Sequence, residues 1–165
     1  MNRKNLTITI YLTLAVLLGS TGTSWGADYQ KGLAAYQSGD FATALREWKP
    51  LAEQGYVYAQ SNLGQMYHNG EGVLQNYKTA FKWYTLAAEQ GHVSAQYNLG
   101  VMYFQGEGVP QDNIYAHMWF NIAASNGDED GGKWRDAVAE QMNTRQINKA
   151  QELARECVRK EYKGC

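Results

Sequence analysis

Three histidines could in principle bind a metal ion or transfer protons. His68, His92 and His117 are widely separated and form no His-x-x-x-His or comparable spacing of metal ligands. We therefore expect them to be exposed or partly buried, with no metal bound. The acidic run Asp128–Asp130 could hold calcium, but it lacks the alternating ligands of an EF-hand loop. Acidic side chains also stabilise the first turn of a helix, and we favour that interpretation.

Two glycine-rich loops, Gly70–Gly72 and Gly106–Gly108, could in principle cradle a phosphate group. Neither is followed by Gly-Lys-Ser/Thr, and both follow predicted helices rather than strands. The chain also lacks a Gly-x-Ser-x-Gly nucleophile elbow. We therefore expect no catalytic residues, no cofactor and no enzymatic activity.

The two cysteines of the chain, Cys157 and Cys165, both lie close to its C-terminus. In an oxidising compartment they would form one disulfide, which would pin the C-terminal tail to the last helix. Two free thiols or a metal site are the alternatives, and the absence of a neighbouring histidine disfavours the metal site. We favour the disulfide.

The N-terminus has the features of a secretory signal peptide. Arg3 and Lys4 precede a largely apolar run, Leu6–Leu18, which is shorter than the ~20 residues of a membrane span. Small and polar residues follow, and we favour cleavage after Gly26 over cleavage after Ala27. We therefore assign residues 1–26 to a signal peptide and expect a periplasmic or secreted protein without a stable membrane span. A retained anchor is the alternative.

The composition is that of a globular protein: 44% of the 165 residues are hydrophobic. The net charge of −1 combines 15 basic and 16 acidic residues. This balance argues against nucleic acid as a partner, because nucleic-acid-binding domains usually carry a basic patch or stripe. It also provides no basic cluster for anionic lipids.

The sequence repeats itself at an interval of 36 residues. Asn62–Gly64 recurs as Asn98–Gly100, and the loop Gly70–Val73 recurs as Gly106–Val109. Each unit contains two stretches with apolar residues at helical spacing, separated by the glycine loop. Repeats of this length indicate stacked supersecondary units that bury their apolar faces against each other.

The period divides the chain into five segments. After residues 1–26 come a shortened hairpin (27–55), two full repeats (56–91 and 92–127) and a C-terminal cap (128–165). In the cap we expect one helix over 133–142 and a second that begins with a capping box of Asn143 and Gln146 and continues to Tyr162. The fold class is therefore all-α, a superhelical solenoid of helical hairpins with a helical cap.

Large aromatic residues recur within the repeats, for example Trp83 and Trp119. They could form a stacking platform for a sugar or nucleobase, but their helical periodicity favours packing in the core. Small residues at Gly64 and Gly100 would allow two helices to approach closely.

The two full units resemble Sel1-like repeats, which are related to tetratricopeptide repeats. The shared motif is Ala-Gln-x-Asn-Leu-Gly-x-Met-Tyr, then Gly-Glu-Gly-Val, then Ala-x-x-Trp-Tyr/Phe-x-x-Ala-Ala, found over Ala59–Ala88 and Ala95–Ala124. The shortened hairpin is more similar to a tetratricopeptide unit. The resemblance implies an α/α superhelix, lined on its concave side by the first helix of each unit, and a scaffold that binds a protein or peptide partner.

Some exported relatives are rich in cysteine and have been linked to penicillin binding. By analogy, an envelope enzyme acting on β-lactams or peptidoglycan is the alternative function. This chain lacks the cysteine pattern of those relatives.

We expect the partner-binding groove on the first helices, beside their core stripes. An amide-rich, neutral groove of this kind could hydrogen-bond an extended peptide. Asn62 and Asn98 could instead tie neighbouring helices together. We expect a monomer, although open solenoid ends can self-associate. The candidate groove residues are Tyr58, Ser61, Asn62, Gln65, Asn69, Ser94, Tyr97, Asn98, Val101, Phe104 and Gln105.

Overall fold

A computed structural model describes residues 26–165 of the chain. The predicted signal peptide therefore lies almost entirely outside the described residues. The described part contains eight helices and no strand. They are α1 (Tyr29–Gln37), α2 (Phe41–Glu53), α3 (Val57–Asn69), α4 (Tyr77–Ala88), α5 (Val93–Gln105), α6 (Asn113–Ser125), α7 (Glu129–Ala139) and α8 (Thr144–Arg159).

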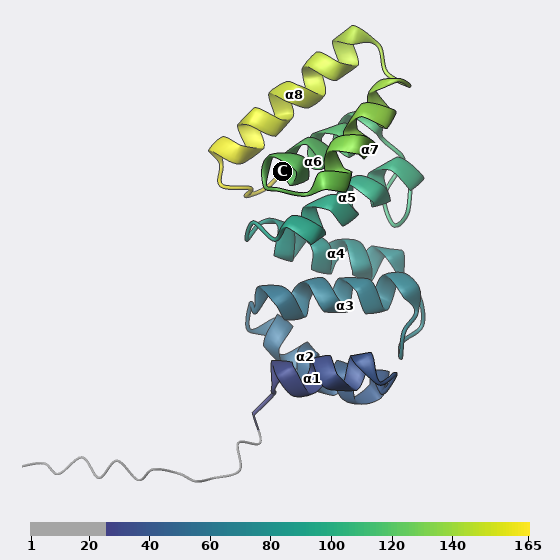
Figure 1. The fold of residues 1–165 in the computed structure, drawn as a ribbon, viewed down its shortest axis with the longest axis vertical. Helices are drawn as coiled ribbons and strands as arrows, with labels where there is room; N and C mark the ends of the chain where they lie inside the picture. Colours follow the sequence, from purple (N-terminus) through teal and green to yellow (C-terminus); the bar gives the residue numbers. More distant parts are fainter. Residues whose placement is uncertain (1–25) are drawn as a thin grey trace, which may run out of the picture.

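The helices stack in chain order into an elongated column, and α8 lies obliquely across its C-terminal end (Figure 1). Three hairpins, α1–α2, α3–α4 and α5–α6, each pack against the next along the column. In the cap, α7 and α8 both pack against α6. The predicted all-α solenoid of helical hairpins is confirmed.

Glycines end the first helices of the two full units and permit close packing inside them. Gly70 and Gly106 follow α3 and α5 in the left-handed conformation, with φ of 76° and 74°. This conformation is costly for residues with a Cβ atom. Within the helices, a Cβ at Gly64 would lie 2.6 Å from the ring of Tyr84, so the small residue allows the aromatic ring to pack on the backbone.

The core runs along the column as stacked layers of small and large apolar side chains. Ala59, Leu63 and Met66 on α3 are fully buried. Trp119 is buried, as predicted, whereas Trp83 is partly buried and packs against the first layers. Both are packing residues rather than an exposed stacking platform. A single hairpin could not cover these faces alone, so neighbouring units stabilise one another.

The cap differs from the prediction at three points. Helix α7 begins at Glu129, because Asp128 caps it by accepting a hydrogen bond from the backbone N–H of Gly131 at 2.7 Å. The acidic run therefore starts the helix, as favoured, but α7 begins and ends earlier than 133–142. Helix α8 has the predicted Asn143 capping box but ends at Arg159. Tyr162, expected on this helix, lies beyond it with a φ of 65°.

Candidate functional site

Side-chain contacts connect the first helices α1, α3 and α5 along one side of the column. The predicted groove residues on α3 and α5 differ in exposure. Five are exposed, namely Tyr58, Gln65, Asn69, Ser94 and Gln105. Five are partly buried, namely Asn62, Tyr97, Asn98, Val101 and Phe104. Ser61 is buried, with 8% of its surface accessible, so its hydroxyl is not available to a partner and we drop it from the candidate set.

An aromatic cluster joins the N-terminal ends of the three first helices. The ring of Tyr29 lies 5.2 Å from that of Tyr56 and 6.1 Å from that of Tyr58, between centroids. The ring of His92 lies 5.4 Å from that of Tyr58. Tyr56 and Tyr58 are 41% and 52% exposed, so this cluster presents aromatic surface to the solvent.

Sequence reasoning found only Tyr58 among these four residues. The 36-residue period contained a signal for two others, because Tyr56 and His92 occupy the same repeat position and are the N-cap residues of α3 and α5. We call the exposed side chains of this side the first-helix surface: Tyr56, Tyr58, Gln65, Asn69, Ser94 and Gln105.

Hydrogen bonds fix several of the predicted groove residues. Asn62 donates through Nδ2 to the hydroxyl of Tyr29 at 3.3 Å. Asn62 therefore ties α3 to α1, which supports the alternative interpretation of this residue.

The C-terminal ends of α1 and α3 are joined by a second network. Gln65 donates to the hydroxyl of Tyr36 at 2.9 Å, and that hydroxyl donates to Glu71 at 2.7 Å. Burial, together with the Glu71 carboxylate, raises the pKa of Tyr36 to about 12. In the next unit, His68 lies 2.8 Å from Glu107 in the corresponding way. The glutamates of the two glycine loops therefore hold successive units together.

Helix α7 covers part of the groove expected on α5. Tyr97 packs on Phe120 with ring centroids 5.5 Å apart, and Phe104 packs on Trp134 at 5.8 Å. Trp134 belongs to α7, which lies outside the repeat pattern. Tyr97 therefore packs within its own unit, whereas Phe104 packs against the cap through Trp134, which is itself 40% exposed.

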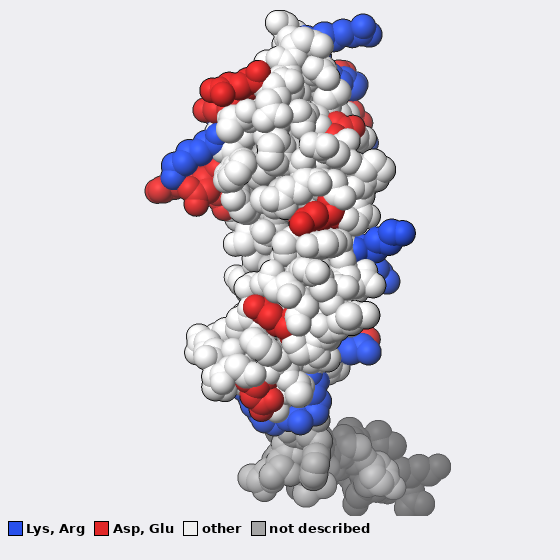
Figure 2. Space-filling view, turned by 90° about the vertical axis from the view of Figure 1, so that its right-hand side faces the viewer, with Lys and Arg blue, Asp and Glu red and all other residues white. Residues whose placement is uncertain are grey.

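The electrostatic character of the solenoid is weak. Figure 2 shows one side of the molecule, on which acidic and basic side chains are interspersed, mostly along the edges, around wide uncharged areas. This side therefore offers neither a basic stripe for nucleic acid nor a concentrated clamp for carboxylates.

The histidines lie in three different environments. His68 pairs with Glu107, and His92 caps α5 by accepting a hydrogen bond from the backbone N–H of Ala95. His117 is only 3% exposed, which corrects the expectation of an exposed or partly buried side chain. The preceding unit has the partly buried Phe81 at this repeat position, whereas α6, which carries His117, is packed against by both α7 and α8. Among residues 26–165, no group of three or more His, Cys, Asp or Glu side chains could hold a metal ion.

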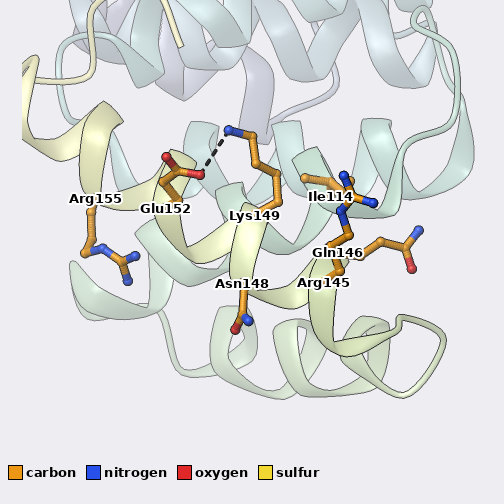
Figure 3. A pocket seen from close by; sticks show the side chains of 7 residues that line it. All are labelled: Ile114, Arg145, Gln146, Asn148, Lys149, Glu152 and Arg155. Carbon is orange, nitrogen blue, oxygen red and sulfur yellow. Dashed lines mark hydrogen bonds and ion pairs between the residues drawn. The ribbon is translucent and has the colours of Figure 1, made fainter.

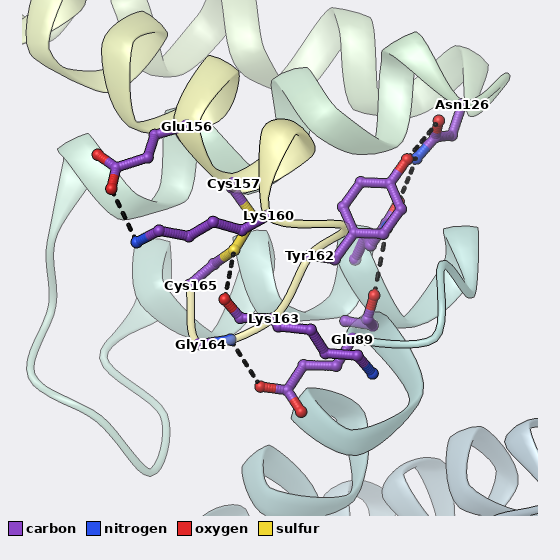
Figure 4. The surroundings of a disulfide bond; sticks show 11 residues. Glu89, Asn126, Glu156, Cys157, Lys160, Tyr162, Lys163, Gly164 and Cys165 are labelled. Carbon is purple, nitrogen blue, oxygen red and sulfur yellow. Dashed lines mark hydrogen bonds and ion pairs between the residues drawn. A yellow bond between two sulfur atoms is a disulfide. The ribbon is translucent and has the colours of Figure 1, made fainter.

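The predicted disulfide joins Cys157 to Cys165 (Figure 4). It places the tail across the ends of two repeats. The hydroxyl of Tyr162 lies within hydrogen-bond distance of the Asn126 side chain, and the backbone N–H of Gly164 donates to Glu89 at 3.0 Å. No helix in the described part of the chain is both long and apolar enough to cross a membrane.

The two full repeats of this chain match a known protein family. The profile of the Sel1 repeat family matches residues 57–92 and 93–128. The chain superimposes on a protective antigen of uropathogenic Escherichia coli strains that displays an SLR fold, with a TM-score of 0.75 and 27% identity. That likeness covers 79% of the chain but 30% of the antigen, so the chain spans less than a third of its length.

A Sel1 repeat protein from Oxalobacter formigenes is 35% identical, with a TM-score of 0.60. This similarity covers 66% of the chain and 85% of the relative. A comparison with curated proteins finds no match. Sel1-repeat proteins generally act as scaffolds for protein interactions, and the fold is generally not catalytic. On the strength of its repeats, its fold and this relative, the chain belongs to the Sel1 repeat family.

Proposed function

We propose that this protein is an exported, monomeric scaffold that binds a protein or peptide partner through its first-helix surface and catalyses no reaction. The observation that carries this proposal is the pair of exposed tyrosines, Tyr56 and Tyr58, at the edge of three stacked helices. Tyrosine is enriched among the residues that contribute most to protein–protein binding, because its ring offers apolar area and its hydroxyl a hydrogen bond.

The remaining side chains of the surface suit an extended peptide. Gln65, Asn69 and Gln105 carry amides, each of which can donate and accept hydrogen bonds. Exposed amides beside an aromatic anchor can pair with a peptide backbone while the rings contact its side chains. Because the surface carries no charged residue, we expect the partner to bind through polar and apolar contacts with little dependence on salt.

The cap and the tail support the assignment to an oxidising compartment. The disulfide between Cys157 and Cys165 is of the kind that persists in secreted and periplasmic proteins. We propose export by a signal peptide of residues 1–26 to the periplasm or beyond. We also propose that residues 27–55 and 128–165 act as the two end units of the solenoid, around repeats at 56–91 and 92–127.

Site-specific photo-crosslinking in the cells that produce the protein tests the function. A photoreactive residue at position 58 should trap one dominant partner, whereas the same residue at position 82, on exposed Lys82 of α4, should not. The Tyr56→Ala/Tyr58→Ala variant, crosslinked from position 94, should lose that partner. An unchanged crosslinking pattern in this variant would show that the first-helix surface is not the binding site.

A further inference from the structure

A cleft lies between α6 and α8, and none of the residues of the first-helix surface lines it. It has a volume of about 770 Å³ and is lined by Ile114 of α6 and by one face of α8. A smaller cleft of about 420 Å³ adjoins it and shares Ile114 and Gln146. A ligand could therefore contact both clefts at once.

The charges that line the larger cleft are mainly positive. Arg145, Lys149 and Arg155 are cationic, and Glu152 is the single carboxylate. Figure 3 shows Arg145 beside Ile114 at one end and Arg155 at the other, with the Lys149–Glu152 pair between them. This arrangement favours a ligand that carries more than one negative charge.

Two of these cations are available to a ligand. The carboxylate of Glu152 is already held by Lys149 at 3.0 Å. Within residues 26–165, neither Arg145 nor Arg155 forms an ion pair, although both line the cleft. Glu156, farther along α8, is itself paired with Lys160 at 2.7 Å. A free guanidinium can bind a carboxylate through two parallel hydrogen bonds.

The smaller cleft supplies a hydrogen-bond donor for a peptide backbone. Asn113 also lines this cleft, but its Oδ1, unpaired among the described residues, is fully buried and lies out of reach of a ligand. Gln146 Oε1 accepts the hydrogen bond of the capping box, and its Nε2 has no partner within residues 26–165. The carboxylate of Asp112 also lines this cleft but is engaged in capping α6.

The separation of the two arginines sets the length of the ligand. Ten residues of helix separate Arg145 from Arg155, which corresponds to ~15 Å along the axis at ~1.5 Å per residue. An extended peptide covers this distance with about five residues at ~3.3 Å each. We propose that the cleft between α6 and α8 binds an extended acidic peptide segment, with its carboxylates on Arg145 and Arg155. This site is independent of the proposed first-helix surface.

Fluorescence anisotropy with a fluorescein-labelled hexaglutamate peptide and the purified full-length chain tests this proposal. We expect saturable binding that weakens as salt rises, because exposed charges are screened. The Arg145→Ala/Arg155→Ala variant should bind roughly five- to tenfold more weakly, which corresponds to about 1.0–1.4 kcal/mol for the two exposed ion pairs together. Circular dichroism should show an unchanged helix content.

The matched control is Lys49→Ala/Lys82→Ala, which removes the same charge from exposed positions on α2 and α4. It should bind like the parent chain, and Tyr56→Ala/Tyr58→Ala should do so as well. A failure of the first-helix surface to bind a partner would therefore leave this result untouched.

Several outcomes would overturn the proposal. They are the absence of saturable hexaglutamate binding, equal binding of labelled hexaglutamine, and an equal loss of affinity in the lysine control. Binding of a thymidine oligonucleotide of equal charge with the same or higher affinity would show a general anion site instead of a peptide site.

Discussion

Asn126, at the end of α6, donates a hydrogen bond through Nδ2 to Oε1 of the fully buried Gln96 on α5, at 2.9 Å. Gln96 in turn donates to the backbone carbonyl of Ala88, at the end of α4. In the preceding unit, Gln60 accepts from Gln90 at 2.7 Å in the corresponding way. One buried amide in each full repeat thus joins its first helix to the ends of two second helices.

Replacing Gln96 should lower the stability of the solenoid, because its side chain hydrogen-bonds the ends of two other helices. In Gln96→Met the side chain keeps its approximate shape but loses two hydrogen bonds, one to the carbonyl of Ala88 and one from Asn126. The Ala88 carbonyl still accepts from the backbone N–H of Gly91, so no buried group is left without a partner. We expect the free energy of unfolding to fall by about 1–3 kcal/mol, at about 0.5–1.5 kcal/mol for each hydrogen bond. Urea unfolding followed by circular dichroism measures it. Gln151→Met, at an exposed position of α8, is the control and should change stability by less than about 0.5 kcal/mol.

Gly100 and Gly132 should respond in opposite directions to the same substitution. A Cβ atom at Gly100 would lie 2.6 Å from the ring of Phe120, whereas one at Gly132 meets only the Cβ of Ala124 at 3.9 Å. Gly100→Ala should therefore destabilise the protein by about 1–3 kcal/mol through overpacking. Gly132→Ala should stabilise it by about 0.5–1 kcal/mol, because alanine is the better helix former. Equal effects in thermal unfolding would contradict this account of the glycines.

The repeated part of the fold was predictable because its local signals agree with its packing. Gly70 and Gly106 mark helix ends at the same repeat position, and apolar residues follow the helical period on both sides of them. The cap has no repeat to support its boundaries. There the N-cap residue Asp128, whose side chain accepts from a backbone N–H, sets the start of α7 more strongly than the apolar pattern that begins near Lys133.

The candidate surface was less predictable, because exposure depends on contacts between units. Nothing near Tyr97 or Phe104 in the sequence shows that Phe120 packs against the first, or that Trp134 of α7 packs against the second. Ser61 likewise follows the polar pattern of the helix yet is buried between helices. The cluster of Tyr29, Tyr56 and Tyr58 joins the starts of two helices, α1 and α3, which only stacking brings together.

The disulfide should contribute measurably to stability. Cys157 and Cys165 are eight residues apart in sequence, and closing a loop of this length in the unfolded chain corresponds to about 2–3 kcal/mol in the chain-entropy model. Cys157→Ser/Cys165→Ser should lose about this amount in urea unfolding, as should the parent chain in reductant. Mass spectrometry should show that reduction adds the mass of two hydrogen atoms to the parent chain and nothing to the variant.

His117 provides the most specific pH dependence. Its ring is buried on α6, its Nδ1 has no hydrogen-bond partner within residues 26–165, and the preceding unit has Phe81 at the same repeat position. Burial, with a smaller contribution from Arg135, lowers the pKa of His117 below its usual value. Burial alone lowers the pKa of His92 in the same direction.

Because the folded state keeps His117 neutral, acid should favour the unfolded state. As pH falls through about 6.5, the unfolded chain binds a proton at this residue and the folded chain does not. The free energy of unfolding should then decrease until the lowered pKa is reached, by at most about 1.4 kcal/mol per pH unit for each histidine. In His117→Phe the slope between pH 7.5 and pH 5 should shrink to the part contributed by His92. Urea titrations across this range measure the slope, which is independent of any constant packing change introduced by the larger ring. Parallel curves for the parent chain and His117→Phe would mean that the buried imidazole takes up its proton equally well in both states.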